Sequence, residues 1–229
     1  GEIMARLTVL RMLCDNPELV RASARLYDHS SDKGSAYASA IVNAGWVKSA
    51  TRSPKLDAVV EYVTNILDED PNNKVVLFSF FRMNLELLRM AFHGKVGSVV
   101  FMGGMSSQEK DAAKQKFAND PDTRLFLSSD AGGYGVDLPM ANHLISYDLP
   151  WSAGKLDQRE SRIIRLSSEF PHVTVTSFVM RGSIEERQYE MLQEKRLINR
   201  AFIDKGYDAQ GRYEITLGSL SDFLSSSEV

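Results

Sequence analysis

The chain has 229 residues, of which 43% are hydrophobic and 25% charged, so it can bury a substantial core as one domain with attachments. No apolar run approaches the roughly 18 residues that a membrane-spanning helix needs, so we expect no contact with a membrane. A net charge of −3 argues against a protein that coats nucleic acid, and the single cysteine, Cys14, excludes a disulfide framework and fits an intracellular location.

The first 50 residues predict a helical connector. Helical patterns run from about Ile3 to Cys14 and from Pro17 to Tyr27. The stretch from His29 to Gly45 is rich in Ser, Ala and Gly, and we expect it to be a flexible connection.

Residues 51–205 alternate strand and helix. Ser53 and Pro54 supply an N-cap and a first-turn proline, and Ser-x-x-Glu capping boxes start helices at Ser106 and Ser183. The expected elements are helix 54–68, strand 74–79, helix 83–92, strand 97–102, helix 107–118, strand 124–128, strand 143–147, helix 153–166, strand 172–179 and helix 184–202. This alternation predicts an α/β fold, a parallel sheet with helices on both faces. Residues 206–229 are predicted as a C-terminal tail.

Two runs of residues carry the chemistry. Residues 128–138, SSDAGGYGVDL, follow a strand, and their three glycines allow positive φ and close approach to a polyanion. In residues 158–165, QRESRIIR, Gln158, Arg162 and Arg165 stand at i, i+4 and i+7, on one stripe of a helix. Two arginines form a charged double fork that suits phosphoryl transfer. The alternative is a solvated helix face with surface ion pairs.

In this order the runs resemble motifs V and VI of superfamily-two helicases. From Lys74 to about Arg200 the chain is similar to the second RecA-like lobe of SWI/SNF-type DNA translocases. Further matches to that family are 10–20 (its "L-R-x-I-C-x-H-P-x-L" connection), 54–56 (its "G-K-L" entry helix), 74–81 (motif IV), 147–151 ("D-P-x-W-N-P") and 182–187 ("G-T-I-E-E-R"). The chain departs from the family at Asp130, where Lys is usual, and at Phe80, which replaces a Gln that often contacts nucleic acid.

The resemblance implies roles for individual residues. The residues implied to meet DNA phosphates, through hydroxyls or backbone amides, are Ser79, Ser128, Ser129, Ala131, Gly132 and Gly133. Gly135 and Asp137 would face ATP from the same loop. Gln158 and Arg162 would hold the γ-phosphate side, and Arg165 would act as the arginine finger. For the three serines, strand-end capping is the alternative.

The sequence contains no G-x-x-x-x-G-K-[ST] phosphate loop, and the resemblance places that loop and the acidic D-E-x-x box for magnesium on a first RecA-like lobe. We therefore expect ATP and Mg²⁺ to be held mainly by that missing lobe, and this chain alone to bind no cofactor or metal and to be inactive. The expected partners are that lobe and double-stranded DNA, gripped through its phosphate backbone. The alternatives are an unwinding RNA or DNA helicase of another superfamily-two branch, or a stand-alone nucleic-acid-binding adaptor. The expected location is nuclear in a eukaryote, or cytoplasmic in a bacterium or virus-infected cell.

Overall fold

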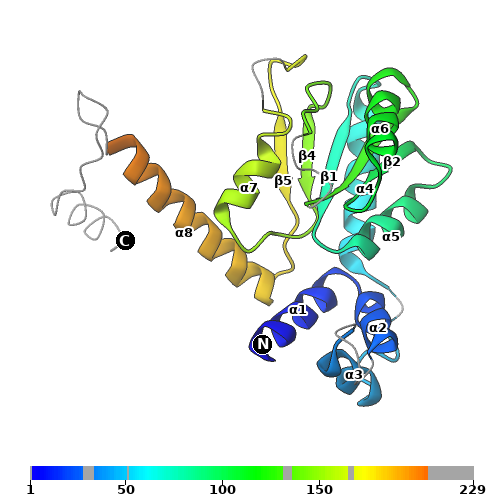
Figure 1. Cartoon of the computed structure of the whole chain (residues 1–229), viewed down its shortest axis with the longest axis vertical. Helices are drawn as coiled ribbons and strands as arrows, with labels where there is room; N and C mark the ends of the chain where they lie inside the picture. Colours follow the sequence, from blue (N-terminus) through cyan, green and yellow to red (C-terminus); the bar gives the residue numbers. More distant parts are fainter. Residues whose placement is uncertain (1, 28–33, 51, 131–135, 165–167, 206–229) are drawn as a thin grey trace.

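The computed structural model describes residues 2–27, 34–50, 52–130, 136–164 and 168–205. Its centre is a parallel sheet of five strands in the order β2-β3-β1-β4-β5 (Figure 1). The strands are β1 (Val75–Ser79), β2 (Gly97–Phe101), β3 (Thr123–Ser129), β4 (His143–Ser146) and β5 (Thr174–Ser177). The predicted parallel α/β sheet is confirmed.

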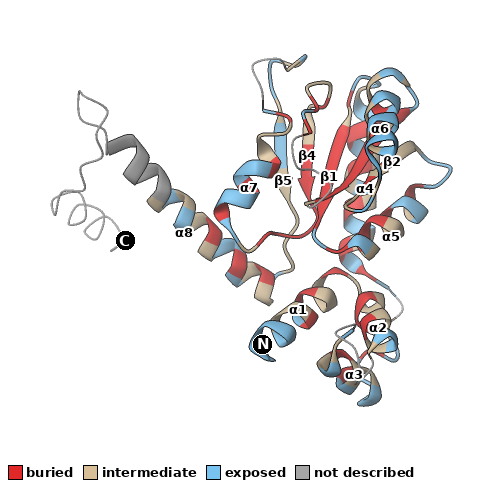
Figure 2. Ribbon diagram, in the orientation of Figure 1, coloured by how far each residue is buried: buried red, intermediate tan, exposed pale blue. Residues whose placement is uncertain are grey.

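One face of the sheet is covered by α4 (Pro54–Glu69) and α5 (Arg82–Phe92). Side chains of successive strand residues point to opposite faces, so Val75 and Leu77 of β1 join this core. They pack with Val59 and Val63 of α4 and with other buried side chains, namely Leu85, Leu88, Phe92, Leu125, Leu127 and Ile145. β1 is buried along its whole length because the opposite face is covered too (Figure 2).

The opposite face is covered by α6 (Ser107–Asn119) and by residues that follow β3 and α7 (Ala153–Glu160). Val76 and Phe78 of β1 lie here, with a shared set of buried side chains, namely Val99, Phe101, Phe117, Phe126, Val136, Leu138, Leu144 and Ile163. The predicted capping box starts α6, with Ser106 and Glu109 bonding each other's backbone N–H. Apolar side chains on both faces explain why the strand sequences are nearly continuous hydrophobic runs.

The N-terminal helices are α1 (Glu2–Asp15), α2 (Pro17–Leu26) and α3 (Ala36–Asn43), and they form a small core of their own. The prediction of a flexible connection over 29–45 is wrong for α3. Its Ser35 hydroxyl caps the Ala38 amide at 3.3 Å, and Ala38 and Ile41 are buried in this small core. Ala is a strong helix former, so the Ala-rich composition favoured a helix once the packing was available.

α7 is shorter than predicted, and this also corrects the position of the arginines. The helix ends at Glu160, not at residue 166. Ile163 is fully buried in the α6-side core, and the Arg162 carbonyl accepts a hydrogen bond from the Leu138 amide at 2.9 Å. The chain leaves the helix to make both contacts, so Arg162 does not share a helical stripe with Gln158, and Arg165 lies outside the described residues.

α8 (Ile184–Lys205) is the longest helix of the described chain. Its first half packs through Leu192 against Leu149 and Leu156, and Figure 1 shows the rest running away from the sheet. The capping box predicted at Ser183 takes a different form, because Glu186 accepts from the amide of Gly182 at 2.8 Å. Within the described part of the chain, no helix combines the length and apolarity that crossing a membrane requires. The predicted tail, 206–229, lies outside the described residues.

Candidate functional site

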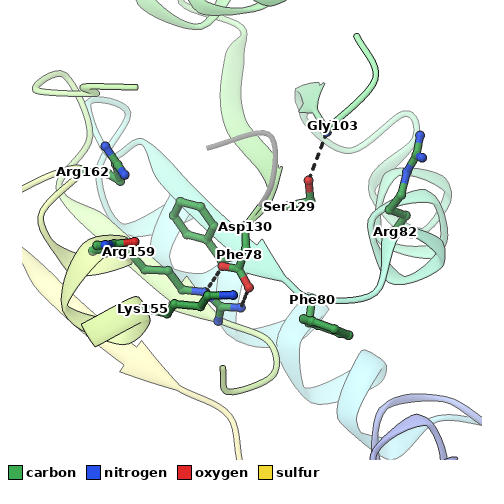
Figure 3. Close-up of a pocket in the computed structure, with 10 residues that line it drawn as sticks. Phe78, Phe80, Arg82, Gly103, Ser129, Asp130, Lys155, Arg159 and Arg162 are labelled. Atoms are coloured by element: carbon green, nitrogen blue, oxygen red, sulfur yellow. Dashed lines mark hydrogen bonds and ion pairs between the residues drawn. The ribbon is translucent and has the colours of Figure 1, made fainter. Parts of the chain in front are cut away.

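A pocket of about 380 Å³ lies at the carboxyl ends of β1 and β3 (Figure 3). In an open parallel sheet this edge is where ligands bind. The described lining consists of Phe78, Phe80, Arg82, Gly103, Ser129, Asp130, Lys155, Gln158, Arg159 and Arg162. The pocket therefore brings together segments from both of the runs that the sequence singled out.

The lining favours an anionic ligand. Arg82 and Lys155 are exposed and come from the first turns of α5 and α7, where the helix dipole also favours negative charge. Asp130 is the only acid among the described lining residues, and both of its carboxylate oxygens are bonded to Arg159. It offers little to a metal ion, so the donor set suits a polyphosphate or phosphodiester better than a Mg²⁺ ion.

Gln158 and Arg162 both line the pocket, although not from one helical stripe, and their role at the γ-phosphate stays a prediction. Gln158 is on α7, whereas Arg162 lies in the turn that follows it. The Arg162 backbone is held on both sides: its amide donates to the Arg159 carbonyl at 3.0 Å, and its carbonyl accepts from Leu138. Arg165 lies outside the described residues, so its role stays a prediction.

Arg159 is the residue that sequence reasoning missed. Its side chain is 2% exposed, and its Nε and Nη2 atoms donate to the two oxygens of Asp130 at 2.6 and 2.8 Å. Nη1 donates to the Asp148 carbonyl at 2.6 Å and to Ser146 Oγ at 3.2 Å. Burial acts to lower the pKa of Arg159, but the bond to Asp130 and the charge of Asp148 outweigh it and raise that pKa.

The three serines predicted to meet DNA phosphates are buried. The Ser79 hydroxyl donates to the Asp148 carboxylate and accepts from Asn84 Nδ2 at 3.1 Å. Ser128 Oγ donates to the Ser129 carbonyl at 3.1 Å. Ser129 reaches the pocket lining, where its hydroxyl accepts from the Gly103 amide at 3.4 Å. These contacts match the alternative of strand-end capping, and the phosphate role stays a prediction.

Of the other site residues predicted in the glycine-rich run, 128–138, only Asp137 lies within the described residues. Asp137 is exposed and is separated by Val136 from residues 131–135, which lie outside the described residues. Ala131, Gly132, Gly133 and Gly135 lie outside the described residues. Their implied contacts with DNA and ATP are therefore predictions.

A buried ionic cluster lies behind the pocket and was not predicted. Lys55 Nζ contacts Asp15 Oδ1 at 2.7 Å and Glu185 Oε1 at 2.6 Å, and Asn84 joins Asp15 to Ser79. Burial and the neighbouring Asp148 raise the pKa of Asp15 well above 3.8, although Lys55 acts against them. One sequence signal was available: Lys55 occupies the apolar stripe of α4, four residues before Val59.

Arg11 joins this cluster to the pocket wall. Its guanidinium is buried, donates to the Leu149 carbonyl at 2.5 Å and lies over the rings of Phe80, Phe81 and Trp151, with its carbon 5.1 to 5.5 Å from the ring centroids. The negative faces of these rings attract the guanidinium cation. Phe80, which departs from the family pattern, therefore covers Arg11 and lines the pocket at once.

Comparison with known proteins identifies the family. The model of the helicase conserved C-terminal domain matches residues 55–167. The DNA repair protein rad8 of Schizosaccharomyces pombe is 35% identical over 149 residues, which is 64% of this chain and 13% of rad8. The curated relatives that we compared are all much longer, because the chain spans only 13 to 30% of each of them.

Two solved structures are similar. The SWI2/SNF2 ATPase core domain of Sulfolobus solfataricus is 28% identical with a TM-score of 0.53, and the match covers 66% of this chain and 31% of that one. The C-terminal part of the Fun30 ATPase domain shares the fold, with a TM-score of 0.62 and 19% identity over 95% of this chain and 77% of that one. The predicted family is confirmed: residues 55–167 form a helicase conserved C-terminal domain of the SWI/SNF type.

Proposed function

We propose that this lobe is the C-terminal motor lobe of an ATP-dependent DNA translocase. In this proposal it supplies arginines and DNA-backbone contacts to an ATPase whose phosphate loop and Mg²⁺-binding carboxylates lie on a first RecA-like lobe. The observation that supports it most is the pocket, whose lining includes Gln158, Arg162, Lys155 and Arg82 at the ligand-binding edge of the sheet. This pocket is a surface that an opposing lobe could close over a nucleotide.

The proposed chemistry is phosphoryl transfer from ATP to water. Charge spreads over the transferred group in the transition state, and planar guanidinium groups are suited to stabilise it. Arg162 would meet the phosphate oxygens from its fixed turn, Gln158 would help to orient them, and Arg165 would act as the arginine finger. Mg²⁺ would neutralise phosphate charge from the first lobe.

DNA is the proposed polymer along which the protein moves. The names of the relatives include a DNA repair protein and RAD54-like repair and recombination proteins. Grip on the phosphate backbone, through Arg82, Ser129 and the amides of residues 131–133, would give sequence-independent binding that weakens as salt is raised. We propose duplex DNA as the substrate, and an intracellular location, nuclear in a eukaryote.

The test uses the full-length protein and measures ATP hydrolysis with duplex DNA, single-stranded DNA or RNA. We expect duplex DNA to stimulate turnover most, and Arg162→Ala and Arg165→Ala each to reduce it about a thousandfold or more, the range known for arginine fingers. Lysine at either position should restore little, because a point charge does not reproduce the planar fork. This chain alone should not hydrolyse ATP.

The matched control is Arg187→Ala. Arg187 is an exposed arginine of α8 that forms an ion pair with Glu190, and it is not part of the described pocket lining. Its removal should leave turnover unchanged. Stimulation by RNA alone would favour the unwinding-helicase alternative, and full turnover by Arg162→Ala would overturn the role of the pocket.

A further inference from the structure

We infer that Arg159 is the positioning residue of the pocket and that Asp130 is its matched partner. Together they hold α7, and with it Gln158 and Arg162, against the carboxyl ends of β3 and β4. The structural part of this inference stands on geometry alone. Its kinetic consequence rests on the proposed function.

Arg159 lines the pocket, but its side chain is 2% exposed and its guanidinium already makes four hydrogen bonds to groups of the protein. The Nε and Nη2 atoms hold Asp130, and Nη1 holds the Asp148 carbonyl and Ser146 Oγ. Nη2 also forms an ion pair with the Asp148 carboxylate, whose Oδ1 lies 3.5 Å away. A guanidinium that is buried and bonded to the protein in this way acts on a substrate through the groups that it holds in place.

The groups that it holds are the ends of three strands. Asp130 directly follows β3, and Ser146 is the last residue of β4. Asp148 extends the contact to β1, because its carboxylate accepts from the Phe80 amide at 2.8 Å and from the Ser79 hydroxyl. One side chain from α7 therefore fixes the helix to the pocket edge of the central three strands.

The pair explains why an acid at position 130 suits this chain. A lysine there, which the family pattern favours, would place a second cation beside the buried Arg159 guanidinium. Bidentate pairing between an arginine and a carboxylate is also geometrically specific. Arg159→Lys would keep the charge and lose the fork, so it should behave like a loss of the pair.

α7 has a second ionic anchor that provides a matched control. Arg196 of α8 contacts Asp157 at 2.8 Å and Glu160 at 2.5 Å. This anchor holds the same helix, but none of its residues lines the pocket. If Arg159 only stabilised α7, breaking the Arg196 anchor should have comparable consequences at the pocket.

The experiment is a double-mutant cycle in the full-length protein with Asp130→Asn, Arg159→Met and the double variant, beside Arg196→Met. The readouts are kcat and KM for DNA-stimulated ATP hydrolysis, and hydrogen exchange of the peptide covering residues 155–164. We expect Arg159→Met to reduce kcat by about ten- to a hundredfold, the range for displaced catalytic groups, with a smaller change in KM. The double variant should be no worse than Arg159→Met, and Arg159→Lys should not rescue kcat.

Exchange over residues 155–164 should accelerate more in Arg159→Met than in Arg196→Met. This second readout does not depend on catalysis. If the wild-type protein shows no DNA-stimulated turnover, the proposed function fails while the exchange result still tests the positioning role. Unchanged exchange in Arg159→Met, additive losses of kcat in the cycle, or an equal loss in Arg196→Met would each overturn the inference.

Discussion

Lys55 shows how a single charged side chain can organise a buried region. Its side chain is 3% exposed, and it bridges Asp15 of α1 and Glu185 of α8. Burial acts to lower the pKa of Lys55, but the charges of Asp15 and Glu185 outweigh it and raise that pKa. The ammonium therefore stays charged, and the stability of the cluster depends on all of its members being present.

Replacing Lys55 by Met should lower the free energy of unfolding by about 3 to 5 kcal/mol, because two carboxylates would stay buried without their cation. Urea denaturation at neutral pH measures this change. The control is Lys114→Met, which removes an ion pair with Asp111 on the surface of α6. Its effect should be at most about 1 kcal/mol, and equal losses in the two variants would show that the Lys55 cluster has no special weight.

At the scale of elements, prediction succeeded where the signal is local. The expected boundaries of α4, α6 and β3 agree with the structure within one residue. Their signals are an N-cap, a capping box and a buried strand pattern, and each of these depends only on residues close together in the sequence. α3 and the end of α7 were wrong because they depend on contacts distant in sequence. The Leu138 amide that holds Arg162 lies 24 positions before it, outside any local pattern.

The candidate site follows the same rule. Gln158 and Arg162 were predicted from a motif, and they line the pocket. Arg159 stands between them in the sequence, but its importance comes from Asp130, 29 positions away, and from Asp148. Burial of Ser79 and Ser128 was equally invisible, since a hydroxyl at the end of a strand suits a ligand or a neighbouring side chain equally well.

Two glycines test how closely these elements pack. A Cβ added to Gly97, at the start of β2, would lie 2.4 Å from the Asp122 carbonyl oxygen, whereas one at Gly154 of α7 would meet only Ser152 Oγ at 3.8 Å. Gly97→Ala should therefore lower the melting temperature. Gly154→Ala should raise the unfolding free energy by about 0.5 kcal/mol, because alanine is the better helix former. The two variants should change the stability of the protein in opposite directions. Equal melting temperatures would contradict the close approach at β2.

Across the whole molecule, contacts behind the pocket join the N-terminal helices and α8 to the sheet. Asp15 accepts hydrogen bonds at its carbonyl from Ser53 at 2.6 Å and from Tyr147 at 3.0 Å, besides its contact with Lys55. Arg11 adds the bond to Leu149, and Gln188 of α8 donates to the same carbonyl at 3.0 Å. These contacts connect the pocket edge to helices outside the matched domain.

The pH dependence of stability should carry a signature of His143, at the opposite end of the sheet from the pocket. Burial lowers the pKa of this imidazole below 6.5, although Glu69 acts against it, and its Nδ1 is buried without a partner among the described residues. As pH falls through 6.5, the unfolded chain takes up a proton that the folded chain resists. His143 therefore contributes stability that is present above pH 6.5 and is lost as pH falls towards its lower folded pKa.

Asp15 acts in the opposite direction, since its raised pKa favours the folded state at low pH and that contribution is lost as pH rises above 3.8. A pH profile of the wild-type protein alone combines the contributions of His143 and Asp15. The measurement is therefore the difference between the unfolding free energies of the wild-type protein and His143→Gln, from urea denaturation at several pH values between 5 and 8. The wild-type protein should lose stability relative to the variant as pH falls below about 6.5, the ordinary histidine pKa. A difference that stays constant over this range would show that His143 is protonated as easily in the folded chain as in the unfolded one.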